Sequence, residues 1–127
     1  MQSLANCEII MDIIEIEKIT AANKILELDV FTKDEERYRF VFDSICCIRY
    51  SIENASLTRF LEFRNFLPEN IVHNCVYIVM ESDYIGYFLK HVDDKAQIDG
   101  LMHYIIYDNM DTKIDVLTNK RPVLIKI

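Results

Sequence analysis

The stretch YRFVFDSICCIRY, residues 38–50, carries the clearest structural pattern in the chain. Its charged residues Arg39, Asp43 and Arg49 all occupy odd positions, whereas the even positions are aromatic, aliphatic or small. A two-residue period of this kind is typical of an antiparallel strand with one buried face. We therefore expect one long strand over residues 38–50, bent near Ser44.

Further strands are expected upstream of this stretch and in the middle of the chain. LELDV, residues 26–30, has the same period, and the charged residues 33–36 predict a hairpin turn after it. Residues 7–19 place some isoleucines at helical offsets, but their density of β-branched side chains favours a strand. The short apolar run at 75–80 is typical of a central strand.

The last quarter of the sequence predicts a hairpin and one edge strand. Residues 102–107 and 113–117 flank the polar loop 108–112, and this arrangement favours a β-hairpin. Residues 123–127 can form one more strand, and the preceding Pro122 restricts it to a strand start or a sheet edge. Both features indicate antiparallel pairing in this region.

Two helices are expected between these strands. Ser56 is suited to cap a helix that ends before Pro68. Ser82 or Asp83 is suited to cap a second helix over residues 84–91. The predicted fold class is therefore α+β, a mostly antiparallel β-sheet of about seven strands with two short helices.

The composition excludes several classes of protein. With 51% hydrophobic residues, including 7 Phe and 7 Tyr, the chain can bury a core, so we expect one folded domain over residues 1–127. Gly86 and Gly100 are the two glycines, and their separation excludes a glycine-rich phosphate loop. No apolar run is long enough to span a membrane. The first apolar run is not preceded by the basic region that a secretory signal requires. We therefore expect a cytoplasmic protein with no membrane partner.

The four cysteines are interpreted as reduced thiols. An even count would allow disulfide pairing in a secreted chain. Cys46 and Cys47 are adjacent, so they point to opposite faces of a strand, and no Cys-x-x-Cys spacing exists for zinc. Together with Cys7 and Cys75, they are expected to pack as small hydrophobic residues in a cytoplasmic protein.

The net charge of -7 favours a basic protein as partner. Residues 1–36 hold nine acidic residues against three lysines, so most of the surplus lies there. A surface of this sign repels phosphate backbones, which disfavours nucleic acid, and accelerates encounter with a basic protein. The alternative is that the charge only keeps the protein soluble.

No motif indicates catalysis, a metal or a cofactor. The three histidines are scattered over a presumed loop, a helix end and a strand, without ligand spacing. Cys75, His103 and Asp115 can be assembled into a triad on paper, but any chain with three histidines permits such a construction. We therefore expect a non-enzymatic protein with no catalytic residue, no metal and no cofactor.

Acidic and tyrosine side chains are the expected recognition chemistry. Tyrosine presents apolar area with a polar tip, although each ring can equally lie in the core. The loop at 108–112 can hold carboxylates toward a partner, with Asp115 on the outward face of its strand; the alternative is that its polar residues only favour a tight turn. The candidate partner-binding residues are Glu27, Asp29, Tyr84, Tyr87, Asp108, Asp111 and Asp115.

A family resemblance follows the order of aromatic motifs along residues 38–123. After YRFVFDSICCIRY come DYIGYF at 83–88, HYIIYD at 103–108, IDVL at 114–117 and RPV at 121–123. This order resembles small bacterial immunity proteins of polymorphic and contact-dependent toxin systems. The resemblance implies a cytoplasmic, non-enzymatic protein that binds one cognate toxin domain and blocks its active site. No individual binding residue is carried over by it.

Because the chain is acidic, the toxin domain bound by such a protein is expected to be basic, a nuclease for example. Two other functions stay open. One is a homodimerising structural or regulatory accessory protein, in which the same aromatic residues form a self-contact. The other is a small hydrolase with an unrecognised site.

Overall fold

The structure is a computed structural model, and it describes residues 3–52, 74–92 and 99–127. These residues form nine strands and one helix. In chain order they are β1 (Ser3–Asn6), β2 (Ile13–Ala22), β3 (Ile25–Thr32), β4 (Arg37–Phe42), β5 (Ile45–Ile52), β6 (Val76–Met80), α3 (Asp83–Lys90), β7 (Met102–Tyr107), β8 (Thr112–Thr118) and β9 (Val123–Lys126).

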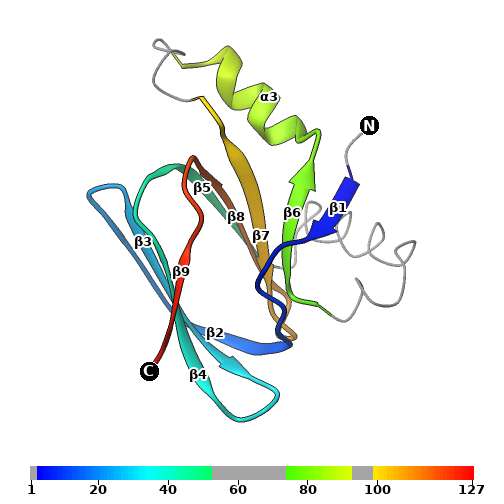
Figure 1. The fold of residues 1–127 in the computed structure, drawn as a ribbon, viewed down its shortest axis with the longest axis vertical. Helices are drawn as coiled ribbons and strands as arrows, with labels where there is room; N and C mark the ends of the chain where they lie inside the picture. The colour runs from blue at the N-terminus through cyan, green and yellow to red at the C-terminus, as the bar shows by residue number, and fades with distance from the viewer. Residues whose placement is uncertain (1–2, 53–73, 93–98) are drawn as a thin grey trace.

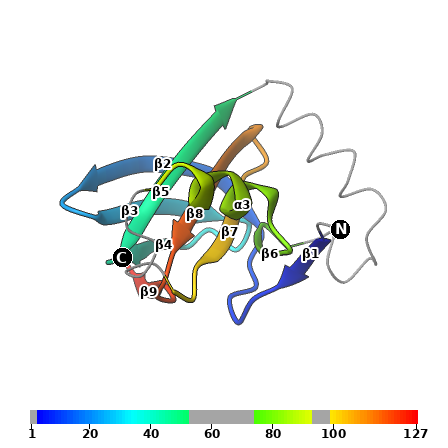
Figure 2. The ribbon, with the colours of Figure 1, turned by 90° about the horizontal axis from the view of Figure 1, so that it is seen from above.

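The strands form two antiparallel sheets, which face each other in Figures 1 and 2. The five-stranded sheet has the order β1-β6-β7-β8-β5, and the four-stranded sheet has the order β2-β3-β4-β9. The predicted antiparallel α+β architecture is confirmed, with more strands than expected. Within the described residues, the two additional strands are β1 and β5. β5 contains the second half of residues 38–50, which were expected to form one long strand.

Side chains from both sheets meet in one core. Leu26, Leu28 and Val30 on β3 are fully buried, as the alternation predicts, and so are Phe40 and Phe42 on β4. The facing sheet contributes Tyr104, Ile106, Ile114 and Val116. The rings of Phe42 and Tyr104 meet edge to face, with 5.6 Å between their centroids. Each such side chain stabilises the fold by about 1.5–3 kcal/mol through burial.

The stretch at residues 38–50 does not form one strand, which corrects the prediction. β4 ends at Phe42 in one sheet, and β5 begins at Ile45 in the other. The corner between them is held by the Ile45 amide, which donates to the Lys24 carbonyl, and by the Thr118 hydroxyl, which donates to the Ser44 carbonyl. Changing sheets at this corner lets the apolar positions on both sides reach the common core.

Residues 7–12 are also not a strand, contrary to the expectation for residues 7–19. They cross from β1 in the five-stranded sheet to β2 in the four-stranded sheet, and the strand begins only at Ile13. The carbonyls of Met11 and Asp12 accept hydrogen bonds from the amides of Cys75 and Lys33. These two bonds tie the crossing segment to both sheets.

Turns and caps agree with the sequence analysis where they are described. Residues 33–36 form the β3–β4 turn, with Glu35 at a positive φ of 61°. The helix predicted over residues 84–91 is present as α3, and Ser82 caps it by accepting the Ile85 amide at 3.1 Å. Pro122 precedes β9, which lies at a sheet edge as predicted. The helix expected to begin at Ser56 lies outside the described residues.

Free thiols are found at Cys7, Cys46, Cys47 and Cys75. Within the described residues, no helix has the length and apolar character that a membrane crossing requires.

Candidate functional site

The predicted residues Glu27 and Asp29 lie on the outer face of the four-stranded sheet, where both meet Arg39. The Arg39 guanidinium donates to both oxygens of Asp29, at 2.7 and 3.0 Å, and its Nε lies 3.5 Å from Glu27 Oε2. The hydrogen bond from Arg39 lowers the pKa of Asp29. One guanidinium on the same face therefore balances part of the negative charge of these two residues.

Asp115 is fully buried, so the expectation that it faces outward is wrong. Its strand alternates as predicted, but the second face of the five-stranded sheet is buried as well. His103 and Lys113, which lie on the same face, are 3% and 4% exposed. An alternating pattern identifies two faces of a strand, and only the packing of other segments decides how many of them are buried.

Asp115 is the centre of a charged cluster. His103 Nε2 lies 2.7 Å from Oδ1, while Lys113 Nζ and Arg49 Nε each lie 3.3 Å from Oδ2. Burial raises the pKa of Asp115, but the hydrogen bond from His103 and the neighbouring positive charges outweigh it and hold the pKa below its usual value. The carboxylate is therefore ionised and acts as an acceptor.

Ser82 extends this cluster to α3. Its Oγ lies 2.6 Å from His103 Nδ1 and also accepts the amide of Ile85. Because Asp115 can only accept, the network assigns an imidazole proton to Nε2, while Nδ1 shares a hydrogen bond with Ser82 Oγ. The order of hydrogen bonds is that of a Ser-His-Asp triad with the two ring nitrogens exchanged. Cys75, the nucleophile considered for such a triad, contacts residues 12 and 13 instead.

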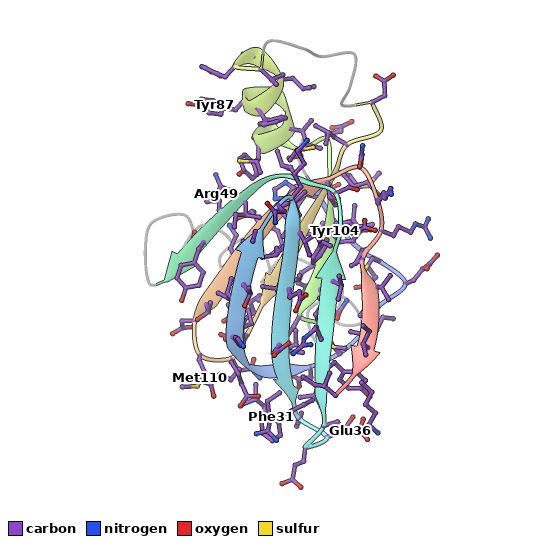
Figure 3. All side chains as sticks on the ribbon, turned by 90° about the vertical axis from the view of Figure 1, so that its left-hand side faces the viewer. Phe31, Glu36, Arg49, Tyr87, Tyr104 and Met110 are labelled. Atoms are coloured by element: carbon purple, nitrogen blue, oxygen red, sulfur yellow. The ribbon has the colours of Figure 1, made fainter. Side chains whose placement is uncertain are left out.

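The two candidate tyrosines have different environments. Tyr84 is half-buried: its ring lies edge-on to His103, the Arg49 guanidinium stacks on it at 4.5 Å, and its hydroxyl donates to Cys47 Sγ. Burial, followed by this hydrogen bond, raises the pKa of Tyr84. Tyr87 is 64% exposed and projects from α3 at one end of the molecule (Figure 3). Tyr87 is therefore available to a partner, whereas Tyr84 attaches the helix.

The two aspartates of the β7–β8 hairpin also have different environments. Asp108 is buried, and its carboxylate accepts the amides of Ile16, Met110 and Thr112 at 2.8–2.9 Å. These bonds form the turn and link it to β2. Asp108 therefore has the turn-forming role that was the alternative to partner binding. Asp111 is half-buried at the tip, with φ of 62°, beside the exposed Met110.

An acidic groove, which the sequence analysis missed, lies at the other end of the molecule from α3. Its volume is about 330 Å³, and four carboxylate residues line it. They are Glu8, Asp12, Asp34 and Glu36. Figure 3 shows Glu36 at this end, with Met110 and Phe31 nearby in the view. No local sequence signal joins residues 8–12 to residues 34–36, because only the path of the crossing segment brings them together.

The four carboxylates of the acidic groove differ in their partners. Glu36 accepts from the Tyr38 hydroxyl and from Lys126, and these two bonds lower its pKa in that order. Glu8 pairs with Arg121, and both side chains are largely exposed. Asp12 accepts from the side-chain amide of Asn109 at 3.1 Å. The groove thus keeps more negative than positive charge.

A second groove, of about 390 Å³, adjoins the acidic one. The two share Glu8 and Ile9. The second groove is lined largely by apolar side chains, among them Ile78, Tyr104 and Pro122. Cys7 also lines it, and burial raises the pKa of this thiol, so it is not activated as a nucleophile.

No group of three or more His, Cys, Asp or Glu residues in the described part of the chain is arranged to hold a metal ion. The sequence matches no protein-family model, no curated protein and no solved structure.

Proposed function

We propose that this chain is a non-enzymatic protein-binding module of the immunity type, which binds a basic toxin domain in the cytoplasm and blocks its active site. The observation that carries the proposal is the acidic groove, with carboxylates from two segments distant in sequence. The resemblance of the aromatic motifs supports the toxin domain as the class of partner.

The groove has the chemistry that lysine or arginine side chains of a partner require. Glu8 and Glu36 already hold the exposed cations Arg121 and Lys126. Exposed ion pairs contribute about 0–1 kcal/mol, so a partner's cation can join or replace them at little cost. Asp34 adds negative charge at the turn between β3 and β4. Such a concentration of charge accelerates the encounter with a basic surface.

Apolar side chains beside the groove supply the contact area. Ile10, on the crossing segment, is 68% exposed, and Met110, on the β7–β8 hairpin, is 62% exposed. The hydrogen bond between Asn109 and Asp12 joins these two segments. An interface that combines an apolar centre with charged neighbours has the usual anatomy of a protein-binding surface.

The proposal is tested by co-expression with the toxin domain of a larger protein encoded by a neighbouring gene. Growth that stops with the toxin domain alone and recovers when this chain is also produced is the expected result. We expect Asp34→Lys to slow association at low salt, because a rim charge acts chiefly on the on-rate. Asp43→Lys, the same change at the other end of β4, is the matched control. Equal association rates for both variants would show that the acidic groove is not where the partner binds.

A small hydrolase is the other candidate that a specific observation favours. The hydrogen bonds from Ser82 through His103 to Asp115 have the order that activates a serine. Two features oppose this function: the Ser82 oxygen caps α3, and the second oxygen of Asp115 is bound by Lys113 and Arg49. Labelling of Ser82 by a fluorophosphonate probe, read by mass spectrometry, would favour the hydrolase. A chain that stays unlabelled would favour the binding module.

A further inference from the structure

We propose that β9 takes up an extended, basic segment of the partner as an additional strand of the four-stranded sheet, an inference that rests on the proposed function. β9 is the edge of that sheet, and it pairs with β4 on one side. An edge strand presents backbone donors and acceptors that another chain can pair with.

The register identifies which backbone groups face the open edge. The Ile127 amide donates to the Arg37 carbonyl at 3.0 Å. Backbone groups of alternate residues point to opposite sides of a strand, so Val123 and Ile125 face β4 in the same way. The amides and carbonyls of Leu124 and Lys126 therefore face the open edge, the side of β9 on which no other described strand pairs.

Both grooves lie along this strand. Leu124 lines the acidic groove, and Pro122, directly before β9, lines the second groove. Because the two grooves share Glu8 and Ile9, they follow one another between β9 and the crossing segment. An extended segment rises about 3.3 Å per residue, so four or five residues span roughly 13–17 Å, the length of β9. A strand added to β9 would have the two grooves on its inner side.

The side chains on the two faces of β9 define the chemistry of the added segment. On the inner face, Leu124 and Tyr38 can pack against the aliphatic part of a lysine or arginine whose charge reaches Asp34 or Glu36. On the outer face, Val123 and Ile125 are 58% and 45% exposed. Since a strand alternates its side chains, the occupant that fits both faces alternates basic and apolar residues.

A second copy of this chain fits the edge less well. Two copies paired through β9 would bring two acidic grooves together, and each chain has a net charge of -7. Like charges in proximity oppose such a pairing, whereas a basic segment is attracted. Charge complementarity thus selects the occupant.

The experiment uses a capped peptide of alternating lysine and valine, with a glutamate–valine peptide as the control. Binding is followed by NMR titration of the whole chain, together with amide hydrogen exchange. We expect the lysine peptide to bind and to slow the exchange of the Leu124 and Lys126 amides. The Ile125 amide, already bonded to β4, is the internal control. The glutamate peptide should leave all three unchanged.

Two pairs of variants separate the backbone contribution from the charge. Lys126→Pro removes the outward amide, while Lys126→Ala removes the same side chain and keeps that amide. We expect the proline variant to bind the lysine peptide about tenfold more weakly than the alanine variant. Asp34→Lys should weaken binding by about the same factor, and Asp43→Lys should not. The NMR spectrum of each variant reports whether the β4–β9 pairing is intact.

Three results would overturn the inference. The first is no binding of the lysine peptide at millimolar concentration, and the second is binding without a change at the β9 amides. The third is slow exchange at Leu124 and Lys126 without peptide, together with a dimer mass by light scattering, which would assign the edge to a second copy. If Lys126→Pro neutralises the toxin domain as well as Lys126→Ala does, strand addition fails while the proposed function stands.

Discussion

His103 donates a hydrogen bond through Nε2 to Asp115 Oδ1 at 2.7 Å, and neither side chain is more than 3% exposed. Ser82 continues the chain of bonds from the imidazole to the first turn of α3. The helix itself contributes no fully buried side chain. Polar contacts and the half-buried ring of Tyr84 together attach α3 to the sheet, and they support the surface that carries Tyr87.

The first prediction concerns the charge of Asp115. Asp115→Asn removes the carboxylate that faces Lys113 and Arg49, and it should lower the free energy of unfolding by about 2–4 kcal/mol. Asp111→Asn, at the tip of the same hairpin, should change it by less than about 0.5 kcal/mol. Urea unfolding measures both. Equal values for the two variants would mean that the buried cluster contributes little to stability.

The second prediction concerns pH. The pKa of Asp115 is lower in the folded chain than in the unfolded one, so its stabilising contribution is present above the unfolded value and is lost as the pH falls through the folded value. The difference in free energy of unfolding between the parent and Asp115→Asn should shrink below about pH 4, where the unfolded and then the folded carboxylate take up a proton. A difference that stays constant to about pH 2 would contradict the assigned direction.

The third prediction concerns the cap of α3. Ser82→Ala removes both the acceptor for the Ile85 amide and the hydrogen-bond partner of His103 Nδ1, and it should cost about 1–2 kcal/mol of stability. Ser82→Thr keeps the hydroxyl and should restore most of the loss. Urea unfolding and the far-UV circular dichroism signal measure these effects. An alanine variant as stable as the parent would show that the network does not hold the helix.

The fourth prediction separates the two tyrosines of α3. Tyr84→Ala should lower the free energy of unfolding by about 1–3 kcal/mol, because the ring contacts both His103 and Arg49. Tyr87→Ala should stay within about 0.5 kcal/mol of the parent. If Tyr87 contacts the proposed partner, its alanine variant weakens binding by about 1 kcal/mol or more while the fold is unchanged. Calorimetric titration measures the binding, and parent-like affinity would exclude Tyr87 from the interface.

Much of the fold was predictable where the signal is local. The alternation at residues 26–30, the turn at 33–36 and the cap at Ser82 each depend on neighbours a few residues away. The two errors, at residues 7–12 and at the corner after Phe42, occur where the chain changes sheets. At those points the same β-branched and aromatic residues suit either a continuing strand or a crossing, and only the facing sheet decides between them.

The sequence by itself determined which residues alternate, where the described turns and α3 begin, and the surplus of negative charge. Tertiary structure alone decided what those residues face. Asp115 alternates like an exposed residue but is buried together with His103 and Lys113, because other segments pack on its side of the sheet, Tyr84 of α3 among them. Glu8 and Glu36 meet in one groove because the segment after β1 crosses between sheets. Periodicity is a property of neighbouring residues, whereas burial and grooves arise from contacts between segments far apart in the chain.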